Sequence, residues 1–140
     1  YDSRWAMLAV VMMSLWAGFG TNMMIFLSGL KGVSQSLYEA ARVEGANRWQ
    51  IFTHITWPSI SKTTFLVTTM LIISSFQVFD QAFILTRGGP GNATITLVYY
   101  IYNNGFNNLN MGYASSISMV LFLIILVFSV LNTRLNNADI

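Results

Sequence analysis

The chain contains no cysteine, and only 9% of its 140 residues are Asp, Glu, Lys or Arg. The missing cysteines exclude disulfides, thiolate zinc sites and cysteine nucleophiles. A soluble domain usually carries about 25% charged residues, so this chain has too few charges to cover a globule of its size. A net charge of +2 without any basic tract gives no indication of nucleic-acid binding.

Apolar residues make up 54% of the chain, and they gather in long runs at residues 5–30, 63–85 and 113–131. Only the second run contains a charge, Asp80. A helix needs about 20 apolar residues to cross a bilayer. Because lipid offers no partner for backbone N–H and C=O groups, spanning segments must be helices or closed barrels. The runs lack the strict alternation of barrel strands, so we predict an all-α membrane protein with about three spans.

The basic residues predict the orientation of these spans. Five of them lie in the connection 31–62 and the tail 132–140, and two lie on the opposite side. The connection and the tail are therefore expected in the cytoplasm, and the loop 86–112, with a short interfacial helix near its tyrosines, outside. The chain does not begin with Met and shows no signal-peptide layout, so we expect it to be a piece of a longer protein.

The cytoplasmic connection contains the stretch EAARVEGANRWQIFTHITWP, residues 39–58. Ser36 followed by Glu39 three positions later predicts an N-terminal capping box. Gly45 predicts the left-handed residue that ends this helix. Asn47 with Gln50 three residues later has the same capping-box spacing and predicts the start of a second helix. Pro58 is expected to end this helix. We therefore expect an ordered helix–turn–helix.

Two explanations for such a hairpin remain open at this point. A plain amphipathic connector resting on lipid headgroups would carry a cationic polar face. The first predicted helix instead carries Glu39 and Glu44 beside two small residues, Ala40 and Ala41. Acidic side chains are repelled by anionic lipid, and small residues allow close approach, which favours docking of a soluble protein.

The stretch resembles the EAA loop in the permease subunits of binding-protein-dependent ABC importers. That family's pattern is Glu-Ala-Ala, three residues, Gly, nine residues, Ile, one residue, Leu-Pro, and every spacing matches. Trp57 stands where Leu is usual, and both are apolar. The later stretch FQVFDQAFILTRGGPGNATITLVYYIYNNGF, followed by GYASS, is similar to carbohydrate-type permeases of the maltose and glycerol-phosphate group.

The resemblance covers essentially the whole chain, 1–140, as one permease region: the C-terminal half of a MetI-like helix bundle in a bacterial inner membrane. It implies that the loop 31–62 seats on a cytoplasmic ATPase subunit, which uses ATP, while this chain binds no cofactor. The other implied partners are a second permease subunit, an extracytoplasmic solute-binding protein and a sugar. The implied docking residues are Glu39, Ala40, Ala41, Gly45, Ile55 and Pro58.

Polar residues inside the spans are the candidates for a substrate path. Ser14, Gly18 and Asn22 recur at i, i+4 and i+8, which places them on one helical face. Ser74 and Ser75 lie in the second run, and the resemblance implies that these two helices line the central path. The alternative is helix packing, because small and polar residues also join helices in membranes.

Three rival functions make different demands on the sequence. The same fold could carry an amino acid, a peptide or an oxyanion. An intramembrane enzyme would need converging ionisable groups, and the spans offer only Asp80. A channel would need a pore-lining repeat or a charge ring, which the sequence does not show. GGPGNAT lacks the Gly-Lys-Ser/Thr of a phosphate loop, and the single His54 makes no metal site.

Overall fold

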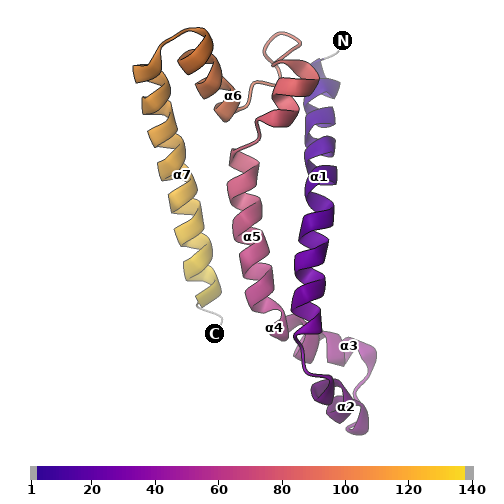
Figure 1. The fold of residues 1–140 in the computed structure, drawn as a ribbon. Coiled ribbons are helices and arrows are strands. Elements are labelled where there is room, and N and C mark those ends of the chain that lie inside the picture. The colour runs from indigo at the N-terminus through magenta and orange to yellow at the C-terminus, as the bar shows by residue number, and fades with distance from the viewer. Residues whose placement is uncertain (1–2, 138–140) are drawn as a thin grey trace. The chain divides into compact units, whose positions relative to one another are not determined.

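The computed structural model describes residues 3–137, and every regular element in that range is helical (Figure 1). In chain order the elements, with η marking a π-helical turn, are α1 (Ser3–Lys31), α2 (Gln35–Val43), α3 (Arg48–Ile51), η1 (Phe52–Thr56), α4 (Trp57–Ser59), α5 (Ser61–Phe76), η2 (Ala82–Thr86), α6 (Leu97–Tyr102), η3 (Asn103–Asn107) and α7 (Met111–Asn137). The predicted all-α fold is confirmed.

The described chain divides into two units. The unit Phe19–Thr68 contains the second half of α1, the hairpin formed by α2, α3, η1 and α4, and the first turns of α5 (Figure 1). The other unit contains the first half of α1, the rest of α5 and everything up to α7.

The helices α1 and α7 are long and apolar enough to cross a membrane. They extend slightly beyond the predicted runs 5–30 and 113–131. Large apolar side chains remain exposed along both, among them Trp16 at 85% and Phe122 at 57%. In water such exposure costs about 25 cal/mol per Å², so these faces require lipid or other protein around them.

The second predicted span, 63–85, is not one continuous helix. α5 ends at Phe76, and residues 77–79 are not helical before the chain turns into η2. The hydroxyls of Ser74 and Ser75 both donate to the Leu71 carbonyl, at 3.1 and 2.7 Å. Such bonds compete with the backbone ladder and often bend helices, which fits a helix end here.

At 16 residues, α5 rises about 24 Å, less than the ~30 Å hydrocarbon core. Only together with the helical stretch Arg48–Ser59, from which it is bent by 62°, is it long and apolar enough to cross a membrane. The run 63–85 is apolar, but the prediction of one helix over its whole length is wrong.

The loop 86–112 contains the expected short helix. Thr96 caps α6, its hydroxyl accepting a hydrogen bond from the Tyr99 N–H at 3.3 Å. The interfacial position of α6 stays a prediction. The asparagine-rich residues that follow, Asn103–Asn107, continue α6 as the π-helical turn η3.

Two contacts join α5 to α7 in the same unit. The Asn132 amide donates to the Thr69 hydroxyl at 2.9 Å, and the rings of Phe76 and Phe128 lie 5.4 Å apart between centroids. Interhelical bonds of this kind hold membrane helices together because lipid cannot compete for the polar atoms.

Candidate functional site

The hairpin 35–59 is the site at which the sequence places most of the candidate residues. Its first helix, α2, begins at Gln35 with Ser34 at the N-cap position, so the predicted cap at Ser36 is wrong. The Ser34 and Ser36 hydroxyls contact each other at 2.7 Å, and Ser34 makes no side-chain cap bond. Serine is a preferred N-cap residue at either position, and the helix starts two residues earlier than predicted.

The turn after α2 forms a Schellman motif, as the prediction for Gly45 requires. The Ala46 N–H donates to the Ala41 carbonyl at 2.9 Å, and the Gly45 N–H donates to the Arg42 carbonyl at 3.1 Å. Gly45 has φ of +80°, and a Cβ added there would meet nothing within 4 Å. Glycine is therefore needed here for its backbone angle and not for lack of space.

The second half of the hairpin starts with the predicted capping box. The Gln50 N–H donates to Asn47 Oδ1 at 2.9 Å, and the Asn47 N–H donates to Gln50 Oε1 at 2.8 Å. This reciprocal pair satisfies two backbone donors that the first turn of a helix leaves unpaired. The prediction of a second helix starting after Asn47 is confirmed.

The expected helix end at Pro58 is displaced. Pro58 lies inside α4, and the helical stretch breaks at Ile60. Proline has no N–H to continue an α-helical ladder. The turn before it is the π-helical η1, in which the Trp57 N–H reaches back to the Phe52 carbonyl.

A single side-chain bond ties the two halves of the hairpin together. The hydroxyls of Tyr38 on α2 and Thr56 on η1 lie 3.2 Å apart. Tyr38 is half-buried, and Ala41, one turn further along α2, is 9% exposed. No local pattern in the sequence indicates Tyr38, because its bond joins residues 18 apart.

The predicted docking residues differ in exposure. Glu39, Ala40, Gly45 and Pro58 are exposed, and Ile55 is half-buried. Ala41 is buried within the chain itself. Exposed residues are available to a partner, whereas the side chain of the buried Ala41 is not.

Three aromatic side chains form a further exposed surface on the hairpin. Trp49 and Phe52 stack with ring centroids 5.8 Å apart, and Phe52 and Trp57 lie 6.3 Å apart. They are 71, 43 and 55% exposed in the order Trp49, Phe52, Trp57. Exposed aromatic clusters of this size are typical of surfaces that meet protein or lipid headgroups.

The substrate-path candidates lie on α1 and α5. Ser14, Gly18 and Asn22 are each partly buried on α1, and the Ser14 hydroxyl donates to the Val10 carbonyl at 2.8 Å. Ser74 and Ser75 are exposed and bonded to the backbone of α5. All three serine hydroxyls are thus engaged with their own helices, and the substrate-path role of these residues stays a prediction.

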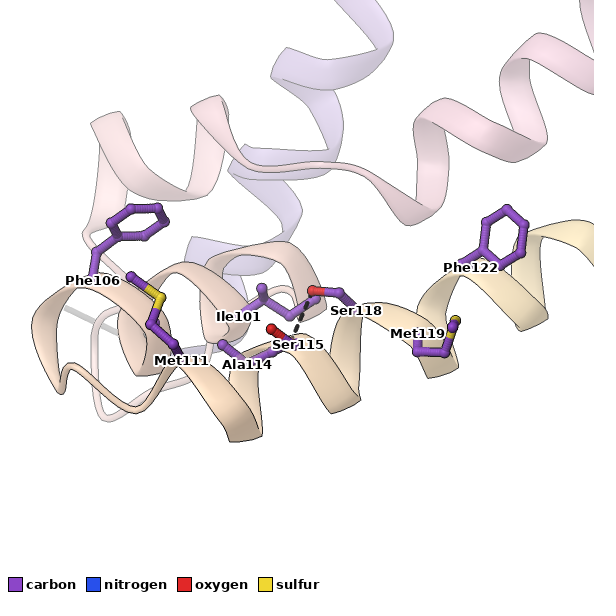
Figure 2. Close-up of a pocket in the computed structure, with 9 residues that line it drawn as sticks. Ile101, Phe106, Met111, Ala114, Ser115, Ser118, Met119 and Phe122 are labelled. Carbon is purple, nitrogen blue, oxygen red and sulfur yellow. Dashed lines mark hydrogen bonds between the residues drawn. The ribbon is translucent and has the colours of Figure 1, made fainter.

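A hollow of about 470 Å³ lies between η3 and α7. Figure 2 shows its lining residues, which are Ile101, Gly105, Phe106, Met111, Ala114, Ser115, Ser118, Met119 and Phe122. The Ser118 hydroxyl donates to the Ala114 carbonyl at 2.9 Å. The lining is mostly apolar, so this hollow offers few of the hydrogen bonds that a sugar needs.

In residues 3–137 no group of three or more His, Cys, Asp or Glu side chains is placed to hold a metal ion. The Nδ1 atom of His54 lies 2.9 Å from the Thr53 hydroxyl and 3.1 Å from the Gln50 carbonyl. His54 is therefore engaged with its own helical turn.

Comparison with known proteins gives the hairpin its context. Residues 2–138 match the model of a family described as "Binding-protein-dependent transport system inner membrane component". An arabinooligosaccharides transport system permease protein from Bacillus subtilis is 38% identical over 133 residues, which are 94% of this chain and 42% of that protein. An sn-glycerol-3-phosphate transport system permease protein from Agrobacterium fabrum is 37% identical over 134 residues, 95% of this chain and 46% of that protein.

A crystal structure of a bacterial alginate ABC transporter, in complex with an alginate pentasaccharide-bound periplasmic protein, has a similar fold. Its TM-score is 0.78 at 23% sequence identity, over 90% of this chain and 44% of that chain. The present chain thus spans less than half the length of these relatives. On the match over residues 2–138, the chain belongs to the family of inner membrane components of binding-protein-dependent transport systems.

Proposed function

We propose that this chain is part of the transmembrane permease subunit of an ABC importer for sugars or related solutes. The family membership and the substrates in the relatives' names, arabinooligosaccharides and sn-glycerol-3-phosphate, support this proposal. ATP is hydrolysed by a partner subunit, and this chain supplies the path and the mechanical connection. A solute-binding protein and a second permease subunit complete the assembly.

The hairpin carries the proposal. α2 presents Glu39 and Ala40 to solvent, the Gly45 turn ends the helix, and the Tyr38–Thr56 bond holds it to η1. A docked ATPase subunit would place a basic or polar group against Glu39 and approach closely over Ala40. A short helix held at both ends can transmit a displacement of the ATPase subunit to the spans, whereas a flexible loop would not.

The energetic requirement is simple. Closure of the ATPase subunits on ATP can drive the permease only if they bind one permease conformation better than the other. A coupling free energy of about 1–3 kcal/mol changes an equilibrium roughly 5- to 150-fold. Loss of a charge-assisted contact at Glu39 would remove about 1.5–3 kcal/mol, which is comparable to that whole coupling.

The first experiment compares Glu39→Lys with Glu44→Lys in the complete transporter. Both residues are exposed, Glu39 in the middle of α2 and Glu44 at its C-cap, and both substitutions change the charge by the same amount. Only Glu39→Lys is expected to reduce co-purification of the ATPase subunit and solute uptake into proteoliposomes, with membrane insertion unchanged. Arabinotriose, sn-glycerol 3-phosphate and an alginate oligosaccharide are the solutes to assay.

A second pair of substitutions, both at Gly45, tests the turn that ends α2. Gly45→Val forces a β-branched residue into left-handed backbone, at about 1–2 kcal/mol, while Gly45→Asn keeps a residue that tolerates this conformation. We expect Gly45→Val to uncouple ATP hydrolysis from uptake and Gly45→Asn to stay close to wild type. Normal uptake in both Glu39→Lys and Gly45→Val, or labelling of position 39 from outside the cell, would rule out the docking role.

A further inference from the structure

The end of α1 and the start of α5 approach each other closely at Gly29 and Thr63. A Cβ built on Gly29 would lie 2.5 Å from Thr63 Oγ1, 2.9 Å from its Cγ2 and 3.0 Å from its Cβ. The three nearest atoms all belong to the Thr63 side chain. A residue with a Cβ therefore fits at position 29 only if the Thr63 side chain or one of the two helices shifts.

Gly29 has no other reason to be glycine. It lies inside α1, where glycine is a poor helix former, and its φ is not in the left-handed region. Gly20, on the same helix and in the same unit, meets nothing within 4 Å when a Cβ is added. The close contact is thus particular to Gly29, and small residues at such crossings let membrane helices pack backbone to side chain.

The connections on both sides of this contact are short. Only residues 32–34 separate α1 from α2, and the Gly32 N–H still bonds to the Ser28 carbonyl at 3.2 Å. On the other side α4 and α5 are separated by Ile60 alone, which is 7% exposed. Val67 lies one turn beyond Thr63 and two turns beyond Ile60, on the same face of α5. It is 2% exposed.

We propose that Gly29 and Thr63 form a clamp that makes the end of α1, the hairpin and the start of α5 move as one body. Displacement of the hairpin then reaches both helices together instead of pulling on one of them. Gly29 and Thr63 are positioning residues in this mechanism. The inference rests on the proposed function, since it explains how a displacement at the docking hairpin enters two helices.

The decisive experiment is a pair of cysteines, Gly29→Cys with Thr63→Cys, in the complete transporter. This chain has no cysteine of its own. Disulfides have Cβ–Cβ distances of about 3.8 Å, so the present 3.0 Å needs only a small relaxation. Gly20→Cys with Thr63→Cys is the negative control, because a Cβ at Gly20 has no neighbour within 4 Å.

The clamp predicts the same disulfide yield, measured by peptide mapping, without nucleotide and with ATP plus vanadate. It also predicts that forming the disulfide does not lower binding-protein-stimulated ATP hydrolysis or uptake relative to the same double variant in its reduced form. A disulfide that forms in only one nucleotide state, or that blocks ATP hydrolysis until it is reduced, would show that the helices separate during the cycle and would overturn the inference.

A second measurement uses Gly29→Ala, with Gly20→Ala as its control. Gly29→Ala is expected to lower the solute imported per ATP hydrolysed by at least about fivefold, the lower end of typical coupling. Thr63→Gly in the same chain removes all three crowding atoms and should restore the ratio. Unchanged coupling in Gly29→Ala, or no restoration by Thr63→Gly, counts against the clamp.

The two levels of the proposal fail differently. If wild type imports none of the three solutes and recruits no ATPase subunit, the proposed function is wrong. If wild type couples normally and the cysteine pair reports separation of the helices, only the clamp is wrong.

Discussion

Thr94 offers a sharp test of how the loop 86–112 is held together. It is fully buried, and its hydroxyl lies 3.0 Å from the Gly89 carbonyl and within hydrogen-bond distance of the Thr86 hydroxyl. Thr86 in turn bonds to the Ala82 carbonyl at 2.8 Å. The substitution Thr94→Val keeps the shape of the side chain and removes only the hydroxyl.

The magnitude follows from counting partners. Without the Thr94 hydroxyl, the Gly89 carbonyl loses its side-chain donor, while Thr86 keeps its bond to Ala82. A buried polar group left without its partner costs about 1–3 kcal/mol. A loss of one to two kcal/mol raises the population of the opened loop roughly 5- to 30-fold. Thr94→Ser keeps the hydroxyl and should open far less.

Trypsin measures this opening at Arg87. Arg87 is exposed, but the next residue, Gly88, is buried, so the bond between them is cleavable only when the loop opens. Cleavage then follows the equilibrium population of the open form when opening and closing are fast. In right-side-out vesicles the fragment beginning at Gly88, identified by mass, should appear about 5- to 30-fold faster in Thr94→Val.

Two results would contradict a role of the Thr94 hydroxyl in holding the loop closed. One is cleavage of Thr94→Val at the wild-type rate, and the other is cleavage of Thr94→Ser as fast as Thr94→Val. The second result would mean that the methyl group, and not the hydroxyl, holds the loop. Cleavage seen only in inside-out vesicles would contradict the predicted orientation of the loop instead.

Three further substitutions test other contacts. Asn47→Ala removes one half of the reciprocal cap with Gln50 and should fray α3, at a cost of about 1 kcal/mol. The affinity for the ATPase subunit should therefore fall several-fold, which titration of the subunit onto the purified permease measures. Asn132→Leu breaks the bond to Thr69 and should destabilise the detergent-solubilised protein by roughly 0.6–1.7 kcal/mol, measured by thermal unfolding. Gly88→Ala places a Cβ 2.7 Å from an aromatic ring at φ of +82° and should accelerate the same trypsin cleavage.

Each of these has a clear contrary result. Asn47→Asp or Asn47→Ser should preserve binding, since both side chains can cap, and a loss equal to that of Asn47→Ala would argue against the cap. An unchanged melting temperature in Asn132→Leu would mean that the helices find equal packing without the bond. Wild-type cleavage in Gly88→Ala would show that the ring yields freely to a methyl group.

Much of the hairpin was predictable because its signals are local. The Asn47–Gln50 box and the left-handed Gly45 depend on residues within a few positions of one another, and the structure confirms both. The start of α2 was mispredicted because Ser34 and Ser36 have the same preference for a cap, so neighbouring sequence alone does not choose between them.

The sequence by itself determined the all-α class and the family, because long apolar runs without strand alternation can cross lipid only as helices. Only the tertiary structure decided that Ala41 packs inward, that Tyr38 reaches Thr56, that Gly29 meets Thr63, and that the second span breaks after Phe76. The physical reason is that lipid tails are as apolar as a packed helix face. An apolar residue in a span therefore carries no local mark of whether its neighbour is lipid or another helix.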